Sequence, residues 1–561
     1  MCGILGIFGE CQLDEMSILQ SILSNRGPDM SGFFEAPGVW LGHTRLAIVG
    51  PETGAQPIVT ANWVVVINGE IYNGSGPTDC YCVPQLLDTW GKDAPLKMDG
   101  VFSFVAYNLN THDIIVARDA IGVTPLYWGT GPTGLYFSSL LAAFPTDALV
   151  KVVPPGHSCC FNMNSRGPDF KPWVGGYNPW TDLKLIPHPD NLVDLMFRSV
   201  EKRLMGDVPW GVLLSGGLDS TIVASIAVKL AQQRRPDYPV VHTFCIGIKG
   251  SPDVHWAKLV AEELGTHHVS VEYTVEEGVA AIPKVIRAVE TYDVTTVRAS
   301  TPMWLLGRAL KCRGIKMVLS GEGSDELFAG YLYNLFCPSE RDMVEECQKK
   351  MNQLHAFDCA RANKTLGDWG VEVRVPFLDR EVVDFAMNRL HPRYKLSGSH
   401  PDGPRPEKWF LRKEFSALIP KCVVDRTKAQ FSDAVGSDWI AQLRLQAAEK
   451  YGETTQSVSN EAKWYKEIFD SSFQQVGAAD TVLYTPSSIA CSSASASGWH
   501  SNFQSHLDPS GDAVAAATGK SLIQNNSIYV SGIGSKTCAP LAEQVTAVDL
   551  GQAFTADTYV K

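Results

Sequence analysis

Apolar and polar segments alternate most regularly in the middle of the chain. Short apolar runs at 210–214, 240–247, 268–275 and 315–319 are separated by stretches whose apolar residues recur at helical spacing. Runs of this length that alternate with helical patterns are typical of strands in a parallel sheet. We therefore predict a doubly wound parallel-sheet domain over residues 190–510. Such sheets bind their ligands at the carboxyl ends of the strands.

The first of these runs ends in a glycine turn, Ser215-Gly216-Gly217-Leu218-Asp219-Ser220. A strand, a tight glycine turn and a helix leave backbone N–H groups open at the positive end of a helix dipole, where phosphate oxygens bind. The turn lacks the Gly-Lys-[Ser/Thr] ending of the kinase-type P-loop. It resembles the pyrophosphate-binding loop of adenylating enzymes, and this resemblance implies that Asp219 helps to hold Mg²⁺. The alternative is a glycine-rich turn without a ligand.

The first 150 residues have a different pattern, with small and apolar residues alternating from Ile4 onward. If an aminopeptidase removes Met1, Cys2 becomes N-terminal, and its own α-amino group can serve as the base for the thiol. An unperturbed α-amine has a pKa near ~8, which suits a base at neutral pH. The alternative is a buried structural cysteine.

Three further motifs accompany Cys2: Arg26–Asp29, Gly42–Val49 and Asn68–Asn73. Together they resemble the N-terminal-nucleophile glutaminase domain of class II amidotransferases. The resemblance implies an αββα sandwich over residues 1–180, in which Cys2 attacks the side-chain amide of glutamine. Asn68 and the Gly69 N–H would form the oxyanion hole, and Arg45 would pair with the substrate α-carboxylate. The residues implied for glutamine binding are Arg45, Leu46, Ala47, Ile48, Val49, Asn68, Gly69, Glu70 and Asp79.

The sequence departs from the family pattern at several positions. Asn25 stands where the family has histidine, and the short segment Gly74–Pro77 replaces a longer, helix-bearing insertion. Tyr81 replaces a glutamate, and the segment Phe137–Ala142 lacks a charge pair that the family has near the domain junction. These departures motivate an alternative in which the shortened glutaminase domain is inactive and free ammonia is the nitrogen donor.

The second half contains Thr295–Arg298, Ser320–Glu326 and Val375–Asp379. With the glutaminase motifs, these segments resemble the glutamine-hydrolysing asparagine synthetases of type B. The resemblance implies that aspartate, ATP and glutamine yield asparagine, glutamate, AMP and pyrophosphate through β-aspartyl-AMP, with Mg²⁺. Ammonia would pass from the first site to the second.

The resemblance also assigns roles to residues of the second half. The residues implied for ATP binding are Leu214, Ser215, Gly216, Gly217, Leu218, Asp219, Ser220, Ile246, Ser320 and Gly321. Asp219 and Asp325 are implied to bind the metal, and Thr295, Thr296 and Arg298 to bind aspartate. The residues implied for catalysis are Cys2, Asn68, Gly69, Glu322, Lys428 and Asp379. Two other interpretations are a β-lactam synthetase-like cyclase, against which Cys2 argues, and a catalytically inactive scaffold, against which the intact motifs argue.

Composition adds limits to this interpretation. The 561 residues have a net charge of −12 and no block of Lys or Arg, which argues against a nucleic-acid partner and favours small-molecule substrates. No apolar run is long enough for a membrane span, and no signal peptide is visible. The 14 cysteines form no spaced framework, which is typical of a reducing cytoplasm. A homodimer is compatible with the resemblance.

Two segments are predicted to lie outside the domains. Residues 165–190 are rich in Pro, Gly, Trp and Asp without periodicity, which is typical of a linker. Residues 511–561 form a Ser-, Gly-, Thr- and Ala-rich extension that we predict to be disordered or peripheral.

Overall fold

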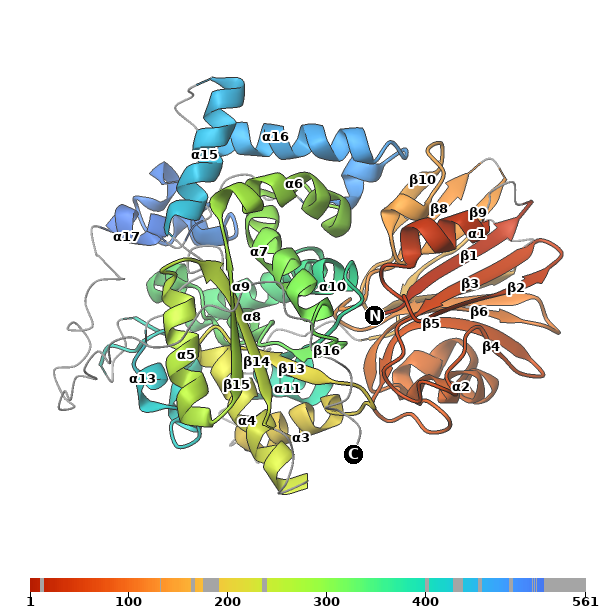
Figure 1. Cartoon of the computed structure of the whole chain (residues 1–561), viewed down its shortest axis with the longest axis horizontal. Coiled ribbons are helices and arrows are strands. Elements are labelled where there is room, and N and C mark those ends of the chain that lie inside the picture. The colour runs from red at the N-terminus through yellow and green to blue at the C-terminus, as the bar shows by residue number, and fades with distance from the viewer. Residues whose placement is uncertain are drawn as a thin grey trace.

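The chain has a β-rich N-terminal region and a larger α/β region that meet along one face (Figure 1). The computed structural model describes residues 1–10, 15–131, 133–162, 167–174, 191–234, 240–398, 403–426, 437–452, 457–483, 488–506, 508, 510 and 512–518. Across these ranges, no helix has the length and apolar character needed to cross a membrane.

The N-terminal region is a sandwich of two six-stranded antiparallel sheets. The first contains β1 (Gly3–Gly9), β2 (Met30–Ala36), β3 (Val39–Arg45), β8 (Tyr127–Gly131), β9 (Gly134–Ser138) and β10 (Leu149–Val152). The second contains β4 (Ile58–Val59), β5 (Trp63–Ile71), β6 (Gly100–Asn108), β7 (Asp113–Arg118), β11 (His157–Asn162) and β12 (Lys171–Pro172).

Alternation along β5 shows how the sandwich is built. Val64 and Val66 pack between the sheets, whereas Val65 and Ile67 point to the opposite face. That opposite face packs against helix α2 (Val83–Trp90), and the short helix α1 (Glu15–Ile18) accompanies the other sheet. The predicted αββα sandwich is therefore confirmed.

The predicted linker is partly incorporated into this sandwich. Strand β12 pairs with β11, and the ring of Trp173 stacks on Phe102 with centroids 5.9 Å apart. Trp173 also donates its indole N–H to the Arg118 carbonyl oxygen. The Pro- and Gly-rich sequence predicts a linker because it lacks periodicity, whereas pairing with β11 and the contacts of Trp173 with Phe102 and Arg118 hold residues 171–173 against the sandwich. Residues 175–190 lie outside the described ranges.

The second region contains a five-stranded parallel sheet with the order β15-β14-β13-β16-β17. Its strands are β13 (Trp210–Leu213), β14 (His242–Ile248), β15 (His267–Tyr273), β16 (Met317–Leu319) and β17 (Glu372–Arg374). All neighbouring pairs are parallel, and the strand order changes direction between β13 and β16. The doubly wound sheet is confirmed, and its switch point is the position at which such folds bind ligands.

Helices cover the sheet because its strands are apolar on both faces, with Val212, Val318 and Leu319 fully buried. They are α3 (Leu192–Arg203), α4 (Leu218–Arg234), α5 (Pro252–Leu264), α6 (Val275–Val289), α7 (Val294–Lys311), α8 (Ser324–Phe328), α9 (Glu340–Gln353), α10 (Asp358–Gly367), α11 (Arg380–Asp384), α12 (Trp409–Phe415), α13 (Lys421–Val424), α15 (Ser437–Tyr451), α16 (Ser457–Ser472) and α17 (Asp512–Thr518).

The beginning of the predicted C-terminal extension packs against this domain. Helix α17 buries Val514 in a small apolar cluster with Leu332 and Phe503. Residues 519–561 lie outside the described ranges.

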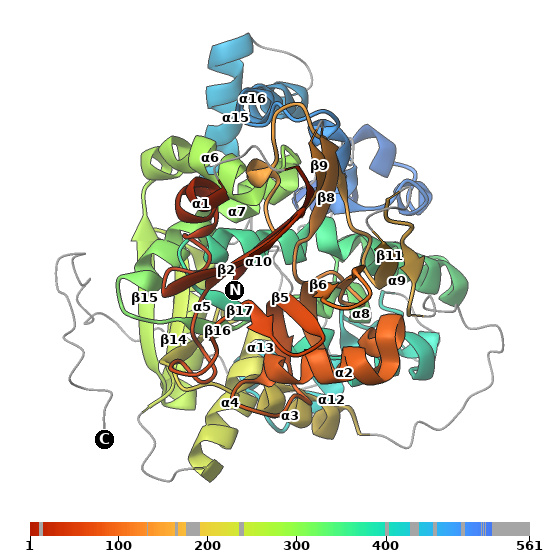
Figure 2. The same ribbon diagram turned by 90° about the vertical axis from the view of Figure 1, so that its right-hand side faces the viewer.

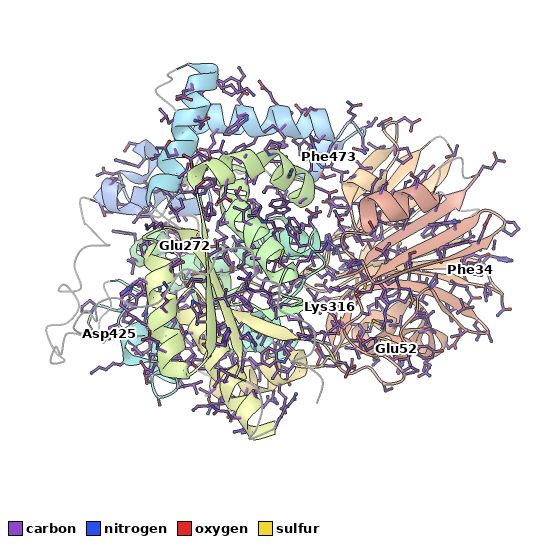
Figure 3. All side chains as sticks on the ribbon, viewed as in Figure 1. Phe34, Glu52, Glu272, Lys316, Asp425 and Phe473 are labelled. Carbon is purple, nitrogen blue, oxygen red and sulfur yellow. The ribbon has the colours of Figure 1, made fainter. Side chains whose placement is uncertain are left out.

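The two regions meet where the ends of β1 and β5 approach β16 and β17 (Figure 2). The Met1 ammonium lies 3.2 Å from Glu372, and Arg374 lies 3.0 Å from Glu70. Lys316, which Figure 3 places at the boundary between the regions, pairs with Asp29 at 2.8 Å. Ion pairs between the regions therefore surround the N-terminus.

Candidate functional site

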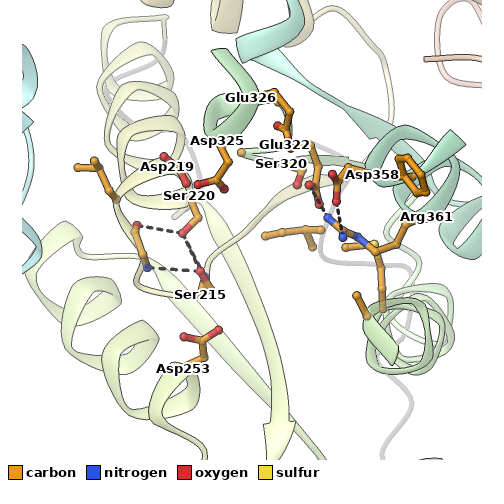
Figure 4. A pocket seen from close by; sticks show the side chains of 18 of the residues that line it. Ser215, Asp219, Ser220, Asp253, Ser320, Glu322, Asp325, Glu326, Asp358 and Arg361 are labelled. Atoms are coloured by element: carbon orange, nitrogen blue, oxygen red, sulfur yellow. Dashed lines mark hydrogen bonds and ion pairs between the residues drawn. The ribbon is translucent and has the colours of Figure 1, made fainter. Parts of the chain in front are cut away.

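A cavity of about 220 Å³ opens at the carboxyl ends of β13, β14 and β16. Both predicted glycine motifs contribute to its wall (Figure 4). The predicted residues that line it are Leu214, Ser215, Gly217, Leu218, Asp219, Ser220, Ile246, Thr295, Thr296, Ser320, Gly321, Glu322 and Asp325. The parallel sheet thus brings together most of the residues that the sequence implies for nucleotide, metal and aspartate.

The turn between β13 and α4 is held by its own hydroxyl groups. The Ser215 and Ser220 Oγ atoms lie 3.2 Å apart, and the Gly217 N–H donates to Ser215 Oγ at 3.3 Å. Gly216 has a φ of +70°, and a Cβ there would lie 2.5 Å from the Trp256 carbonyl carbon. Gly216 therefore shapes the loop against α5 rather than lining the cavity.

Two carboxylates converge at one side of the cavity. Asp219 Oδ2 and Asp325 Oδ1 lie 2.5 Å and 2.7 Å from the Lys408 ammonium, and Ser324 Oγ donates to Asp219 Oδ1 at 2.7 Å. Nowhere in the described ranges do three or more His, Cys, Asp or Glu side chains form a metal-binding group. One or two carboxylates together with substrate phosphates are a usual Mg²⁺ environment, so the pair fits the predicted metal.

Glu322 is held by an arginine that sequence reasoning missed. Arg361 Nη2 donates to Glu322 Oε2 at 2.6 Å, and its other terminal nitrogen pairs with Asp358 (Figure 4). Asp358 and Arg361 are three positions apart on α10, so they face the same side of the helix. Nearby, burial and the charges of Asp358 and Asp325 raise the pKa of Glu326 to about 8.

The predicted aspartate-binding residues separate in the structure. Thr295 and Thr296 line the cavity at the start of α7, where Asp293 caps the helix by accepting from the Thr296 N–H at 2.9 Å. Arg298 does not line this cavity: it is 1% exposed and forms a bidentate pair with Glu461 at 2.8 and 2.6 Å. Its side chain also lies 3.6 Å from Asp508, and its carbonyl oxygen accepts from the Trp439 indole N–H, so its described contacts connect α7 to α15, α16 and Asp508.

Asp379 likewise lies away from the cavity. It caps α11 by accepting from the Glu381 N–H at 3.0 Å and pairs with Arg203 at 2.8 Å. Burial opposes its ionisation, but Arg203 and Lys202 lower the pKa of this carboxyl below its ordinary value. The contacts of Asp379 are those of an internal ion pair.

Lys428 lies outside the described residues. Arg426, two positions earlier, donates to the Ser215 carbonyl oxygen at 3.2 Å and to Asp253 at 2.7 Å. The chain therefore reaches the glycine turn at residues 215–220 two positions before Lys428.

The sequence did not predict several polar residues of the cavity wall, among them Asp293, Tyr331, Asp358, Arg361, Lys408 and Arg426. The i, i+3 spacing of Asp358 and Arg361 and the proximity of Arg426 to Lys428 were usable signals. No sequence signal pointed to Lys408, because only the tertiary fold brings it next to the two carboxylates.

The second site surrounds Cys2. The Cys2 N–H donates to Asn68 Oδ1 at 2.9 Å, and Cys2 Sγ lies 3.9 Å from the Leu46 carbonyl oxygen. Asn68 Nδ2 is buried and has no hydrogen-bond partner among the described residues. Gly69 has a φ of +148°, and a Cβ there would lie 2.1 Å from the Val101 carbonyl oxygen. The unpartnered amide is the donor that an oxyanion hole requires.

Met1 covers this site in the full chain. Its side chain is 3% exposed, and its ammonium group is bound to Glu372. Burial raises the pKa of the Cys2 thiol above its ordinary value, while the nearby N-terminal ammonium acts in the opposite direction. Removal of Met1 would make Cys2 the N-terminal residue and free its own α-amino group.

The predicted glutamine-binding residues are largely occupied by internal contacts. Arg45 donates to the carbonyl oxygens of Val49, Gly50 and Pro51 at 2.7–3.0 Å. Asp79 Oδ2 accepts from the Ile71 N–H at 2.8 Å. This contact forms although the preceding segment is short.

The remaining residues of this set lie at the boundary between the regions. Leu46 and Ile48 pack against Met317 of β16, and the Ala47 N–H donates to Asp29 at 2.7 Å. Burial raises the pKa of Glu70 well above its ordinary value, although Arg374 acts against this shift.

The fold and these two sites define a two-part protein: a sandwich of two antiparallel sheets with a cysteine site, joined to a domain with a doubly wound parallel sheet and a cavity at its switch point. Residues 1–155 match the family described as glutamine amidotransferase domain, and residues 191–348 and 336–501 match asparagine synthase. The chain belongs to the asparagine synthase family.

Individual relatives are similar over nearly the full length. The chain is 41% identical over 556 residues to asparagine synthetase [glutamine-hydrolyzing] 3 of Arabidopsis thaliana, covering 91% of this chain and 94% of the relative. It is 42% identical over 557 residues to asparagine synthetase [glutamine-hydrolyzing] of Asparagus officinalis, covering 91% and 92%. A solved "structure of the allosteric regulatory enzyme of purine biosynthesis" is 16% identical, with a TM-score of 0.28, and covers 48% of this chain and 80% of its own.

Proposed function

We propose that this chain is a glutamine-dependent asparagine synthetase with two coupled sites. The observation that carries the glutaminase half is the pairing of Cys2 with Asn68, whose amide nitrogen is buried without a partner among the described residues. The family membership and the relatives' names support the overall reaction.

At the first site, the α-amine of Cys2, freed by removal of Met1, takes the thiol proton. The sulfur attacks the amide carbon of glutamine, and Asn68 Nδ2 with the Gly69 N–H stabilises the oxyanion. Ammonia leaves with the proton from the amine, and water hydrolyses the thioester to glutamate. Asp79 accepts a hydrogen bond from the Ile71 N–H even though the segment before Asp79 is short. This contact supports a functional glutaminase site.

At the second site, the β-carboxylate of aspartate attacks the α-phosphorus of ATP and pyrophosphate leaves. The turn at residues 215–220 would hold the phosphates, and Thr295 and Thr296 would contact aspartate. Ammonia then attacks the acyl carbon, Glu322 accepts a proton, and AMP leaves.

Mg²⁺ would be held by Asp219 and Asp325 and would neutralise charge on the pyrophosphate. Lys428 would assist the adenylation step. A cytoplasmic location and a homodimer complete the proposal.

Asparagine formation from aspartate and Mg·ATP tests the proposal, with glutamine or ammonium as donor, in the wild type, Cys2→Ala and the control Cys312→Ala, an exposed cysteine. We expect both donors to support the wild type and the control, and ammonium alone to support Cys2→Ala. Activity of the wild type with ammonium alone would favour the ammonia-dependent alternative. No asparagine and no AMP with either donor would refute the synthetase assignment.

A further inference from the structure

Lys408 occupies the position between the two carboxylates at which a metal ion would bind. Its side chain is 1% exposed, and its ammonium lies 2.5 Å from Asp219 Oδ2 and 2.7 Å from Asp325 Oδ1. Asp219 follows β13 and Asp325 follows β16, the two strands at the switch point of the sheet. A single ammonium therefore joins carboxylates from the two halves of the nucleotide cavity.

The backbone around this contact is shaped to admit the lysine side chain. Lys408 has a φ of +53° and Ala329 a φ of +54°, a left-handed conformation that is unfavourable for residues other than glycine. At Gly330, an added Cβ would lie 1.9 Å from Lys408 Cε and 2.1 Å from Asp325 Oδ1. Strain of this kind is kept where the surrounding structure fixes the residue and is concentrated at functional sites.

Electrostatics make the lysine and a metal ion competitors. Two adjacent carboxylates repel each other and need a cation, which the buried ammonium supplies when no substrate is bound. A Mg²⁺ ion would approach the same oxygens to about 2.0–2.1 Å. The ammonium and the ion cannot both occupy that position, because their charges have the same sign.

The displaced ammonium can bind at another position in the same cavity. Lys408 and the turn at residues 215–220 both line the cavity, and the ammonium already contacts Asp219 of the turn, so rotation of the side chain can bring it to phosphate oxygens bound there. Lysine is a common point-charge ligand for phosphate.

We propose that Lys408 holds the cation position between Asp219 and Asp325 in the nucleotide-free protein and moves to the pyrophosphate group when a metal-bound nucleotide enters. This inference rests on the proposed nucleotide function of the cavity. It makes metal binding dependent on the phosphates, since the metal alone must compete with a tethered ammonium.

The test uses Mn²⁺ alone, with no nucleotide, aspartate or glutamine, and measures binding by the electron paramagnetic resonance signal of free Mn²⁺. The variants are Lys408→Met, Lys408→Arg and the control Lys395→Met, which removes a buried lysine outside the cavity. We expect Lys408→Met to bind Mn²⁺ at least about tenfold more tightly than the wild type. Lys408→Arg and Lys395→Met should bind it as weakly as the wild type.

Two further readouts separate this role from a purely structural one. Mn²⁺ should raise the melting temperature of Lys408→Met but not that of the wild type or of Lys395→Met. With Mn²⁺ present, the dissociation constant of inorganic pyrophosphate should rise about tenfold or more in Lys408→Met. If Lys408→Met does not fold, Lys408→Gln, which can still donate to the carboxylates, replaces it.

Equal Mn²⁺ affinity in the wild type and Lys408→Met would overturn the inference. Tight Mn²⁺ binding by the wild type that Asp219→Asn abolishes would also overturn it, and this arm needs no Lys408 variant. The outcome is distinguishable from failure of the proposed function, because these assays involve no asparagine synthesis. A protein that makes no asparagine but shows the Mn²⁺ difference would retain the lysine exchange and lose the synthetase assignment.

Discussion

The polar groups of the Cys2 site and those of the nucleotide cavity are satisfied in different ways. Around Cys2, Arg45 is bound to backbone carbonyls, Asp79 to a backbone N–H and Glu70 to Arg374. This site lies at the boundary between the two regions, and some of its charged partners come from the synthetase side. The neutralisation of Glu70 therefore depends on how the two regions dock.

The nucleotide cavity, by contrast, belongs to one sheet and pairs its charges through side chains that can exchange partners. Lys408 bridges Asp219 and Asp325, and Arg361 bridges Glu322 and Asp358. Side-chain ion pairs of this kind can be replaced by a charged substrate, whereas backbone contacts fix a loop. The first site thus depends partly on contacts between the two regions, whereas the second is held by side-chain ion pairs within one domain.

The largest effect is expected from Arg374→Met, which removes the buried cation between Glu70 and Glu372. Leaving buried carboxylates without this partner should cost about 3–5 kcal/mol in the free energy of unfolding. Asparagine formation with glutamine should fall more than that with ammonium, since Glu70 belongs to the Cys2 site. Urea denaturation measures the loss of stability, and the two donor assays measure the loss of activity.

The half-exposed pair Arg389–Asp384 provides the control Arg389→Met, which should cost less than about 1 kcal/mol in the free energy of unfolding. Equal losses with both donors would contradict a dependence of the Cys2 site on docking.

Asp219→Asn tests the second site without disturbing the first. Because the substitution removes a carboxylate from the proposed metal pair, asparagine formation with either donor should fall about 100- to 1,000-fold. Glutamine hydrolysis, followed by glutamate release, should persist. The exposed Asp470→Asn serves as a control. Loss of glutamine hydrolysis in Asp219→Asn alone would mean that the two sites are not separable in this way.

Arg298 decides between the aspartate-binding role predicted from the sequence and a role in packing. Arg298→Met should destabilise the protein by about 3 kcal/mol, because Glu461 is left buried without its bidentate partner. The double variant Arg298→Met/Glu461→Met should recover most of this loss, and the KM for aspartate should stay near the wild-type value. Recovery of stability together with a large increase in the aspartate KM would restore the binding role.

The smallest expected effect is a pH dependence of the stability of the N-terminal sandwich. Burial lowers the pKa of His43 to about 3, against about 6.5 when unfolded. As the pH falls, His43 is therefore protonated in the unfolded chain before it is protonated in the folded chain. The stabilisation of the fold by neutral His43 is complete above pH 6.5 and is lost progressively between pH 6.5 and 3. From pH 6.5 to 5 the loss should be about 2 kcal/mol.

His43→Asn should remove this part of the pH dependence, because the asparagine side chain does not titrate. Hydrogen exchange of peptides from β3, measured in urea at each pH, reports on this domain. The control is His157→Asn in the same sandwich. An unchanged slope in His43→Asn would show that another group carries the acid sensitivity.

Local patterns in the sequence predicted the strands and the glycine turn at residues 215–220. The apolar runs at 210–214 and 315–319 end in glycine motifs, and a parallel sheet necessarily brings such ends together. The resemblance further anticipated the pairing of Cys2 with Asn68, since both positions follow from ordered motifs. The expectation of family membership was confirmed by matches over both halves of the chain.

Other contacts depended on segments distant in the sequence. Arg298 and Asp379 were expected at the substrate site, yet their partners are Glu461 and Arg203, which no local pattern connects to them.

The sequence by itself therefore determined the two folds, the family and the motifs that line the cavity, because these depend on periodicity and on contiguous residues. Only the tertiary structure decided how each buried charge is neutralised, including the placement of Lys408 between Asp219 and Asp325. The reason is physical: a buried charge requires a partner at about 3 Å, and a partner at that distance can come from any part of the chain.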